Sequence, residues 1–501
     1  MFLTNTNTPE DFFSPFRNQI IGREQTFTSP YGIKRIYYTD WTASGRGYGP
    51  IETSLQQEIL PFVANTHTTA SITGSCMSQA YQEAKNIIKQ HVHASSDDVL
   101  IFCGSGMTSA VNKLQRILGL RIPERIMDYT VQPDFPIAAI LRPVVFITHM
   151  EHHSNQISWL ETIAQVEIIA CDENGQVDLV HFHSLLEQYR HRKNKIAAVT
   201  ACSNVTGIQT PYHEIARMIH AYNGLCFVDF ACSAPYVQIN MHPATGNAHL
   251  DAIYFSPHKF LGGPGTPGVL IFHQKMYTNS IPDQPGGGTV VYTNPWQEHD
   301  YAENITERED GGTPPFLQGI KAAMCIRLKE AMGVENIARR EEEMLQLLFD
   351  RFALIHNITV LAGHIKKRLG IISFIVHGAH HNLIVKILND RFGIQTRGGC
   401  SCAGTYGHWL LQVDQSTSHA IRDQILAGNL HCKPGWVRLS VHPTMTDADL
   451  HYIMDAITCT AASFQEWKKD YIYDTAHNEY IFKGPVAAEQ NRIKTWFNIS
   501  G

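Results

Sequence analysis

AIYFSPHK, residues 252–259, is followed by FLGGPG and ends a short apolar run on one lysine, Lys259. The run predicts a buried strand end, where a lysine is costly to desolvate as a cation. That cost lowers the pKa of the amine and leaves a nucleophile suited to forming a Schiff base with an aldehyde cofactor. Ser256 and His258 are polar groups that could hold a phosphate, and the glycines allow close approach of the backbone. The alternative is a surface lysine in a glycine-rich loop.

Short apolar runs alternate with helix-like segments on both sides of this stretch, between about residues 98 and 275. The runs lack strict alternation and are rich in Val, Ile and Phe, as are parallel strands covered on both faces. The expected strands are Val99–Cys103, Val144–Thr148, Val166–Ala170, Ile196–Thr200, Leu225–Asp229, Ala252–Phe255 and Gly268–Phe272. This pattern predicts an α/β domain with a mainly parallel seven-stranded sheet, and functional groups at the carboxyl ends of its strands.

The pattern changes after the last of these strands. Gln284–Pro315 is rich in Gly, Pro, Asn and Thr, which predicts a long loop that is functional or lies at a subunit contact. Gln318–Ile355 has helical spacing, and we expect Gly333 to divide it into two helices. A smaller α+β domain is expected to contain the strands Gly370–Val376 and Trp436–Ser440 and the helix Leu450–Trp467.

Composition limits the function classes. The chain has 501 residues, 44% of them hydrophobic and 17% charged, and a formal net charge of -6, which argues against a nucleic-acid or anionic-membrane partner. No secretory signal and no apolar run of about 18 residues is present, so a cytoplasmic location is expected. The 11 cysteines should then be reduced, and they form no zinc-type pairs. The 27 histidines are scattered, and no metal site is expected.

Two polar motifs follow predicted strands in the first half of the domain. CGSGMTS, residues 103–109, opens a predicted helix whose free N–H groups could bind a phosphate, although a plain strand-to-helix turn has the same appearance. EHHSN, residues 151–155, places an imidazole where it could stack on a heteroaromatic ring. A metal site there is disfavoured because the i, i+4 histidine spacing of a helical zinc site is absent, and a polar loop is the remaining alternative.

Two more polar groups end the next strands. Asn204 could present its amide to a phenolic oxygen. Asp229, at the end of an apolar strand, would be buried as an anion only beside a cation, and a protonated pyridine nitrogen is such a partner. A helix N-cap is the alternative role for this aspartate. Together with Lys259, the set suits one pyridoxal 5'-phosphate (PLP).

The chain resembles the class V aminotransferases of fold type I, in the group of cysteine desulfurases and selenocysteine lyases. The most specific matches are EHHSN and SPHK at residues 151–155 and 256–259, and YYTDWTAS at residues 37–44 is similar to an N-terminal family stretch. The resemblance covers about residues 37 to 457. It implies a large PLP-binding domain with a seven-stranded sheet and a smaller α+β C-terminal domain. The implied segments are residues 1–50 packing on the small domain, 51–320, 321–470 with the cysteine loop, and a C-terminal extension, 471–501.

The resemblance also implies roles for individual residues. Lys259 would hold the cofactor covalently and act as base, His152 would stack on its ring, and Asp229 would pair with the ring nitrogen. Asn204 would lie near the phenolic oxygen and the substrate, and Arg438 would clamp the substrate carboxylate. The implied phosphate contacts are Met107, Thr108, Ser256 and His258, with Thr289 reaching the phosphate of a neighbouring subunit in a homodimer.

RGGCSCAG, residues 397–404, resembles the family's cysteine loop and places Cys402 at the desulfurase nucleophile, with Cys400 two residues before it. Both could instead be buried structural cysteines. Attack on sulfur needs a thiolate, and Arg397 is a candidate cation to stabilise it. Three features depart from the family: Cys232 replaces a cofactor-contacting glutamine, Met107 replaces a small or hydroxyl residue, and the stretch 406–435 is long.

The expected function is therefore removal of sulfur from cysteine, giving alanine and a persulfide on the enzyme, with a sulfur-acceptor protein as a further partner. The first alternative is transamination, or another PLP-dependent lyase reaction, that uses no cysteine nucleophile. The second is a non-catalytic PLP-binding partner protein, against which the intact set of Lys259, Asp229 and Arg438 argues.

Overall fold

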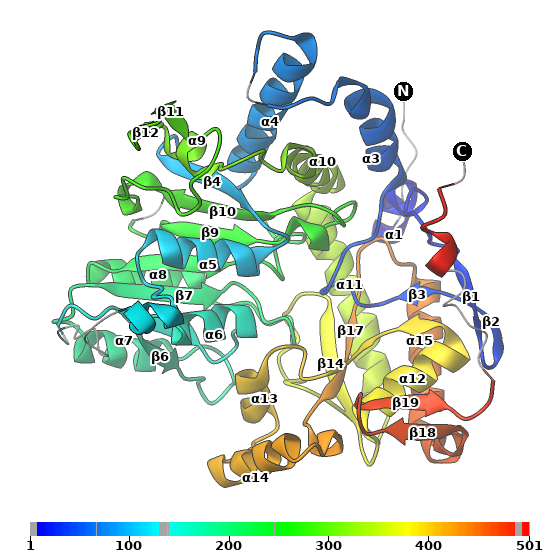
Figure 1. Ribbon diagram of the computed structural model, residues 1–501. Coiled ribbons are helices and arrows are strands. Elements are labelled where there is room, and N and C mark those ends of the chain that lie inside the picture. Colours follow the sequence, from blue (N-terminus) through cyan, green and yellow to red (C-terminus); the bar gives the residue numbers. More distant parts are fainter. Residues whose placement is uncertain are drawn as a thin grey trace.

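The computed structural model describes residues 8–66, 68–129, 138, 140–244, 246–485 and 493–499. Parts of the expected N-terminal and C-terminal segments, residues 1–7, 486–492 and 500–501, therefore lie outside the described residues. The chain forms a large seven-stranded sheet with helices on both faces and, beside it, a smaller four-stranded sheet (Figure 1).

The large sheet confirms the seven expected strands, each to within one residue at its ends. Its order is β4-β10-β9-β8-β7-β5-β6, and only β10 runs antiparallel to its neighbours. The strands are β4 (Asp98–Cys103), β5 (Val144–Thr148), β6 (Gln165–Ile169), β7 (Lys195–Thr200), β8 (Leu225–Asp229), β9 (Ala252–Phe255) and β10 (Gly268–His273).

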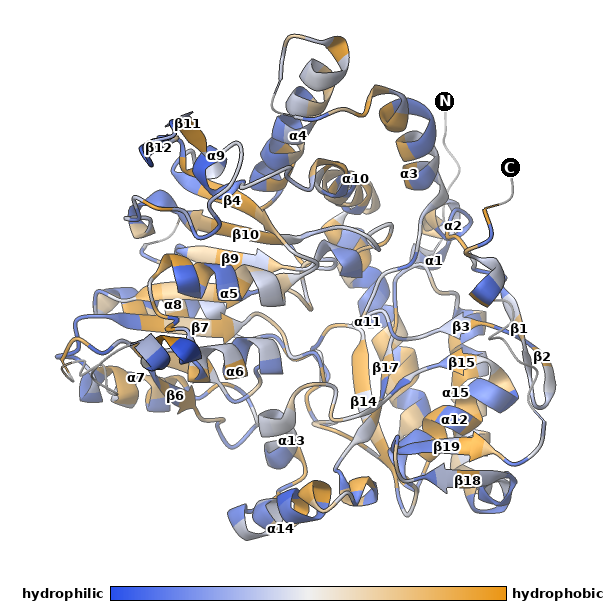
Figure 2. Ribbon diagram, viewed as in Figure 1, coloured by the Kyte–Doolittle hydropathy of each residue, from blue (hydrophilic) through white to orange (hydrophobic). Residues whose placement is uncertain are grey.

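Alternate side chains of each strand enter two separate apolar layers, because successive side chains of a strand point to opposite faces. In β4, Leu100 and Phe102 join the layer that contains side chains of α4, α7, α8 and α10, whereas Val99 and Ile101 join the layer of α5 and α6. Burial on both faces explains why these strands are mostly apolar, whereas the edge strand β6, with Gln165 and Glu167, is only partly buried (Figure 2). The helices are α4 (Ile72–His91), α5 (Met107–Ile117), α6 (His153–Leu160), α7 (Leu179–Gln188), α8 (Tyr212–Ala221) and α10 (Phe316–Met332).

The smaller sheet has the order β13-β14-β17-β16 and is antiparallel. It is reached through α10 and α11, which meet at Gly333 with φ of 74°, so the expected break at this glycine is confirmed. The elements are α11 (Val334–Phe352), β13 (Ile358–Val360), β14 (Ile371–Val376), α12 (His381–Phe392), β16 (Arg397–Gly399), β17 (Trp436–Ser440) and α15 (Asp447–Trp467).

The expected unbroken loop over residues 284–315 is wrong in part. The segment contains a hairpin of β11 (Val290–Thr293) and β12 (His299–Tyr301), and a short helix, α9 (Ile305–Glu309). The two strands are short and largely exposed, so they lack the alternation of buried and exposed residues by which a strand is recognised in sequence.

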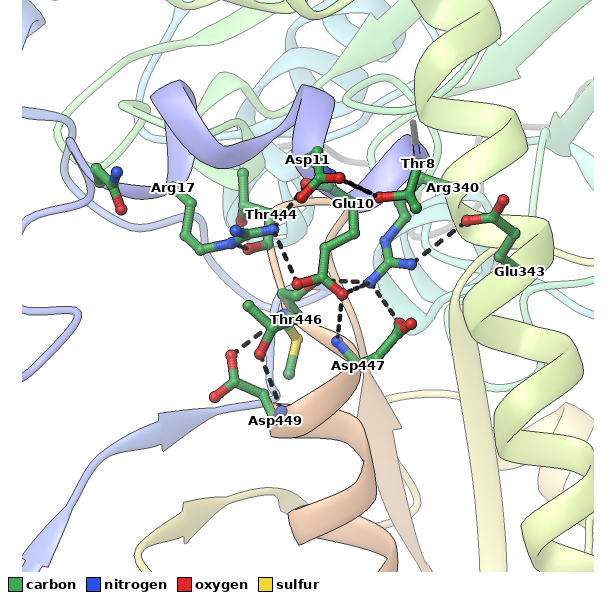
Figure 3. Close-up of polar contacts among 12 residues, drawn as sticks. Thr8, Glu10, Asp11, Arg17, Arg340, Glu343, Thr444, Thr446, Asp447 and Asp449 are labelled. Carbon is green, nitrogen blue, oxygen red and sulfur yellow. Dashed lines mark hydrogen bonds and ion pairs between the residues drawn. The ribbon is translucent and has the colours of Figure 1, made fainter. Parts of the chain in front are cut away.

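The N-terminal segment packs beside the smaller sheet, against α11 and α12. Its β3 pairs in parallel with β15, and Arg17 donates from Nε to the carbonyl of Thr444 at 2.6 Å. Close by, Arg340 of α11 donates to Asp447 Oδ1 at 2.8 Å, and the N–H of Asp447 donates to Glu10 at 2.9 Å (Figure 3). The segment comprises α1 (Pro9–Phe12), α2 (Ser14–Arg17), β1 (Thr26–Ser29), β2 (Gly32–Arg35), β3 (Tyr37–Tyr38) and α3 (Gly49–Ser54), and β15 is Ile394–Gln395.

Two further features lie beyond the two sheets. The long stretch after the cysteine loop forms α13 (Gly404–Leu410) and α14 (Gln415–Leu426), and α14 has no buried residue. The C-terminal extension begins with a hairpin of β18 (Tyr471–Asp474) and β19 (Glu479–Phe482). No helix in the described ranges combines the length and apolarity needed to cross a membrane.

Candidate active site

The carboxyl ends of five large-sheet strands meet the cysteine loop and β17 around a cavity of about 250 Å³. The cavity therefore lies where ligands bind in doubly wound α/β folds. Of the residues singled out from the sequence for the cofactor, the substrate or the nucleophile, these line it: Met107, Thr108, His152, Asn204, Asp229, Cys232, Ser256, His258, Lys259, Cys402 and Arg438. Arg397 lines it as well, whereas Thr289 does not.

Lys259 follows β9 on a single 3₁₀ turn that begins at Pro257. Within the described part of the chain its Nζ has no hydrogen-bond or ion-pair partner. Burial lowers the pKa of its amine, and Arg438 and Arg397 lower it further against the opposing attraction of Cys232 and Asp229. A larger share of uncharged amine than an ordinary lysine has is therefore available in the cavity.

One end of the cavity is built from the start of α5 and the turn before Lys259. The N–H of Met107 donates to Ser256 Oγ at 2.9 Å, and Thr108 Oγ1 lies 2.7 Å from Ser154 Oγ. A side chain at Gly106 would meet Ser256 Oγ and His258 Cε1 at 3.0 Å each, so the glycine keeps this cradle open. A helix N-terminus with hydroxyls beside it could hold an anion such as a phosphate.

His152 forms the N-cap of α6, where its Nδ1 accepts from the N–H of Ser154 at 3.1 Å. The ring proton of the neutral imidazole is therefore on Nε2. Burial lowers the pKa of His152 to about 3, helped by the charges of Lys259, His153 and Arg438. A neutral ring at the cavity wall is suited to stacking against a cationic heteroaromatic ring.

Asp229 ends β8 as a buried carboxylate. Its Oδ1 accepts from the N–H of Ala231 at 2.8 Å, which is a local turn contact, and the described residues between β8 and β9 form no helix for it to cap. Burial raises the pKa of Asp229 to about 6, although the bond from Ala231 and the charge of Lys259 act in the opposite direction. The group is costly to keep ionised there unless a cation or a strong donor enters the cavity.

Asn204 connects the large domain to the cysteine loop. Its Nδ2 donates to the carbonyl of Ser401 at 2.7 Å, and its buried Oδ1 has no partner among the described residues. The amide is thus already engaged on one side, and one remaining N–H is left for a ligand oxygen.

Two thiols form part of the cavity wall behind Lys259. Burial raises the pKa of Cys202 well above its usual value. Both thiols donate to the carbonyl of Ser203, at 3.5 and 3.8 Å, and the neighbouring Cys202 lowers the pKa of Cys232 against its burial, with the charge of Lys259 adding to the lowering. Cys232, for which the resemblance implies a glutamine position, is thus the more acidic thiol of the pair.

The cysteine loop has a strained backbone. Ser401 and Cys402 have φ of 51° and 56°, values that only a few per cent of non-glycine residues adopt. The loop is held by the N–H of His153, which donates to the carbonyl of Cys402 at 2.7 Å. Cys402 is exposed and lines the cavity, so it is not a buried structural cysteine, whereas Cys400 is half-buried against the core.

Arg438 is 3% exposed and already has partners. Its Nη2 donates to Asp40 Oδ1 at 2.6 Å and its Nη1 to the carbonyl of Asn204 at 3.2 Å, while its buried Nε has no partner among the described residues. The other oxygen of Asp40 accepts from Nε of Arg397 at 3.0 Å. Three N–H groups of Arg438 therefore remain for a carboxylate.

Thr289 is buried in its own chain, where its Oγ1 donates to the carbonyl of Gly286 at 2.7 Å. It precedes the β11–β12 hairpin, whose Val291, Tyr292 and Trp296 are 72%, 52% and 78% exposed. An isolated chain therefore leaves Thr289 outside the cavity and an apolar hairpin in water.

Sequence reasoning assigned no role to two residues of the site. Asp40, within the quoted N-terminal stretch, contacts both arginines. Glu151, which precedes His152 in the chain, is buried and accepts bonds from Thr148 Oγ1 at 2.6 Å and Asn155 Nδ2 at 2.7 Å, and its burial raises its pKa to about 7. Charged residues beside a strand end were the available signal for Glu151, whereas no local pattern connects Asp40 with residues about 400 positions away.

One histidine-rich group lies apart from the cavity. Ligand atoms of His220, His249 and Asp251 lie within 4.8 Å of one another. The two imidazole rings stack at 4.0 Å with an interplanar angle of 13°, which keeps their lone pairs parallel instead of convergent on one ion. His220 Nε2 lies 2.8 Å from Asp251 Oδ2, and this pair is the main contact of the group.

The chain matches a known protein family and several curated relatives. The family model of the class-V aminotransferases matches residues 142–453. Curated relatives include probable cysteine desulfurases of Halalkalibacterium halodurans, 27% identical over 75% of this chain and 86% of that protein, and of Staphylococcus aureus, 25% identical over 75% and 85%.

Solved structures share the fold. A cysteine desulfurase from Thermococcus onnurineus aligns with a TM-score of 0.68 at 22% identity, covering 85% of this chain and 95% of that one. The Escherichia coli cysteine desulfurase CsdA aligns with a TM-score of 0.67 at 18% identity, covering 90% and 98%. The expected α/β fold of type I, with its mainly parallel seven-stranded sheet, is thus confirmed. The chain belongs to the class-V aminotransferases, a family of PLP-dependent enzymes.

Proposed function

We propose that the protein is a PLP-dependent cysteine desulfurase, which removes sulfur from cysteine and leaves alanine. One observation carries this proposal: a single cavity brings a half-buried lysine with no polar partner among the described residues, a buried aspartate and a buried arginine next to an exposed cysteine. The names of the curated relatives support the same reaction.

The cavity suits PLP by its donor set. Met107, Thr108, Ser256 and His258 would hold the phosphate, His152 would face the ring, and Asp229 would meet the ring nitrogen. Asn204 and Cys232 would face the phenolic oxygen. When bound, the cofactor supplies an electrophilic carbon and a ring that accepts electrons. Asp229 fits this role because a pyridinium nitrogen provides the cation that its buried carboxylate lacks.

Lys259 has two tasks in this proposal. Its uncharged amine would hold the cofactor covalently, and the substrate amine would release it. The released amine then removes the proton from the substrate Cα as a general base, for which a lowered pKa is suited. Arg438 orients the substrate carboxylate through its remaining N–H groups, which fixes the Cα–H bond toward Lys259.

Cys402 takes the sulfur. Its thiolate attacks the substrate sulfur, an S–S bond forms, and the C–S bond of the substrate breaks with its electron pair passing to carbon. That carbon takes up a proton, so cysteine and the Cys402 thiol become alanine and a Cys402 persulfide with no added oxidant or reductant. An exposed thiol on a loop can then pass the sulfur to an acceptor protein.

The assembly is proposed to be a homodimer, in which Thr289 of one chain reaches the phosphate of the other. The exposed apolar hairpin beside Thr289 supports this arrangement. The four segments expected from the sequence, with the boundaries 1–50, 51–320, 321–470 and 471–501, remain our proposal for the domain organisation.

The test is an absorbance titration of cofactor-loaded protein with cysteine, selenocysteine and alanine, with product analysis in the presence of a thiol reductant. We expect alanine and sulfide in equal amounts from cysteine. Alanine formation from selenocysteine alone would make the protein a selenocysteine lyase. A spectral response with a keto-acid product, and no alanine, would favour transamination and contradict the proposal.

A further inference from the structure

Arg397 and Arg438 lie directly opposite each other on the antiparallel strands β16 and β17. Like charges in directly opposite positions destabilise a strand pair. The carboxylate of Asp40 bonds to both, with Oδ1 2.6 Å from Nη2 of Arg438 and Oδ2 3.0 Å from Nε of Arg397. One carboxylate therefore neutralises one of two positive charges at this wall of the cavity.

The backbone holds Asp40 in this position. Asp40 forms a parallel bridge with Ser440 of β17, and the N–H of Ser440 donates to the carbonyl of Thr39 at 2.8 Å. On the other side the N–H of Thr42 donates to Ser440 Oγ at 3.0 Å. With both flanks tied to β17, the backbone at Asp40 is fixed beside the two arginines.

The net charge of Asp40, Arg397 and Arg438 limits which ligands this wall of the cavity can bind. Both arginines line the cavity, whereas Asp40 does not. Two guanidinium groups and one carboxylate leave a net charge of one, which matches the single carboxylate of a neutral amino acid such as cysteine or alanine. A substrate with a second anionic group would bring more negative charge than this wall can balance.

We propose that Asp40 is a specificity-determining positioning residue, which acts through Arg397 and Arg438 to limit the cavity to amino acids with one anionic group. This inference rests on the proposed function, since it assumes that Arg438 receives the substrate carboxylate. Asp40 itself contacts no substrate. If Asp40 only held the arginines in place, its loss would weaken the binding of every ligand equally. If Asp40 sets the net charge of the group, its loss changes the preference between ligands of different charge.

The experiment uses the cofactor-loaded protein at low salt, because salt screens the effect. Absorbance changes give the apparent Kd for alanine and for aspartate, which has the same carbon skeleton with a second carboxylate. The variants are Asp40→Asn, Asp40→Glu, Arg397→Gln and the double variant Asp40→Asn/Arg397→Gln. Asp470→Asn is the matched control, because Asp470 bonds to Arg391 at 2.9 Å and does not line the cavity.

The preference for aspartate over alanine should follow the net charge of the group. We expect this preference to rise about tenfold in Asp40→Asn, in which the group gains one unit of net positive charge. It should fall about tenfold in Arg397→Gln, in which the group loses one unit. The double variant restores the charge and should restore the wild-type preference, as should Asp40→Glu. Asp470→Asn should leave it unchanged.

Parallel loss of affinity for both ligands in Asp40→Asn, with no change of preference, would overturn the inference. If Asp40→Asn does not fold, an unchanged preference in Arg397→Gln overturns it equally. The wild-type protein separates the two proposals. A wild type that responds to neither amino acid refutes the proposed function, whereas a responding wild type whose variants keep its preference refutes this inference alone.

Discussion

Cys402 and Cys400 are two residues apart and differ in their surroundings. Cys402 is exposed at the cavity, and Cys400 is half-buried against the core. We predict that Cys402→Ser lowers alanine formation from cysteine by about a thousandfold or more, because the serine hydroxyl cannot accept the sulfur. Cys400→Ser is the matched control and should retain most of the activity. The measurement is alanine production under single-turnover conditions.

Cofactor absorbance distinguishes loss of the nucleophile from loss of the cofactor, because both variants should bind PLP as the wild type does. Full activity in Cys402→Ser would show that Cys402 is not the nucleophile and would favour the reactions that need no thiol.

Asp229 gives a pH prediction for the cofactor-free protein. Its pKa is raised from 3.8 to about 6, so folding favours the protonated form, and stability is lost as pH rises between these two values. Asp229→Asn removes this loss and can still accept from Ala231. The variant should be more stable than wild type at pH 8, by on the order of 3 kcal/mol, and equally stable near pH 4.

Urea denaturation of the cofactor-free proteins at the two pH values measures this difference. Cofactor should reverse the order at pH 8, because only the aspartate pairs with a pyridinium nitrogen. A wild type that is the more stable of the two cofactor-free proteins at pH 8 would contradict the account.

The sequence predicted those site residues that follow a strand on the chain. Lys259, Asp229 and Asn204 each come within a few residues of a strand end, and parallel strands bring such ends together. The contacts of Asp40 could not be predicted, because its partner Arg438 is 398 positions away and no local pattern marks such a pair.

At the level of elements, the ion pair of His220 and Asp251 joins α8 to the loop before β9. His220 of α8 bonds through Nδ1 to the carbonyl of Asn247 at 2.6 Å and through Nε2 to Asp251 at 2.8 Å. The pKa of His220 is raised by the bonds to Asp251 and Asn247, which outweigh the opposing effect of its burial. The pKa of Asp251 is lowered to about 2 by bonds from His220, His249 and Cys226, against its burial.

The ion pair of His220 and Asp251 should stabilise the protein only within a certain pH range. The raised pKa of His220 gives stability that is present below its usual 6.5 and is lost as pH rises through the raised value. The contribution of Asp251 is present above 3.8 and lost as pH falls through about 2. His220→Gln should therefore lower the thermal midpoint more at pH 5.5 than at pH 9. An equal lowering of the thermal midpoint at both pH values would contradict an ion pair between His220 and Asp251.

The helices and strands also show which elements the hydrophobic pattern of the sequence can predict. The seven strands of the large sheet were predicted to within a residue, because burial on both faces makes all of them except the edge strand β6 compact apolar runs. The β11–β12 hairpin was missed because its strands are exposed and one has only three residues, so its sequence matches a loop. The helices α13 and α14 fill a stretch for which the sequence predicted no elements.

For the molecule as a whole, Thr289 tests the proposed dimer. Thr289→Val keeps the shape of the side chain and removes the hydroxyl that would reach the neighbouring phosphate. We predict weaker cofactor retention, by roughly tenfold as for one lost charge-assisted hydrogen bond, although Thr289 lies outside the cavity of its own chain.

Equilibrium dialysis measures cofactor retention, and sedimentation should show a dimer for both proteins. Thr306→Val, in α9 on the same segment, is the control and should retain cofactor as wild type does. A monomer with full cofactor affinity would contradict the proposed exchange between subunits.

The central claim is that Lys259 holds PLP covalently. The direct test is borohydride reduction of PLP-loaded protein, followed by proteolysis and mass spectrometry. The account predicts one pyridoxyl label, located on Lys259, and no label in Lys259→Ala. A label on another lysine, or no label on a protein that has taken up the cofactor, would contradict it.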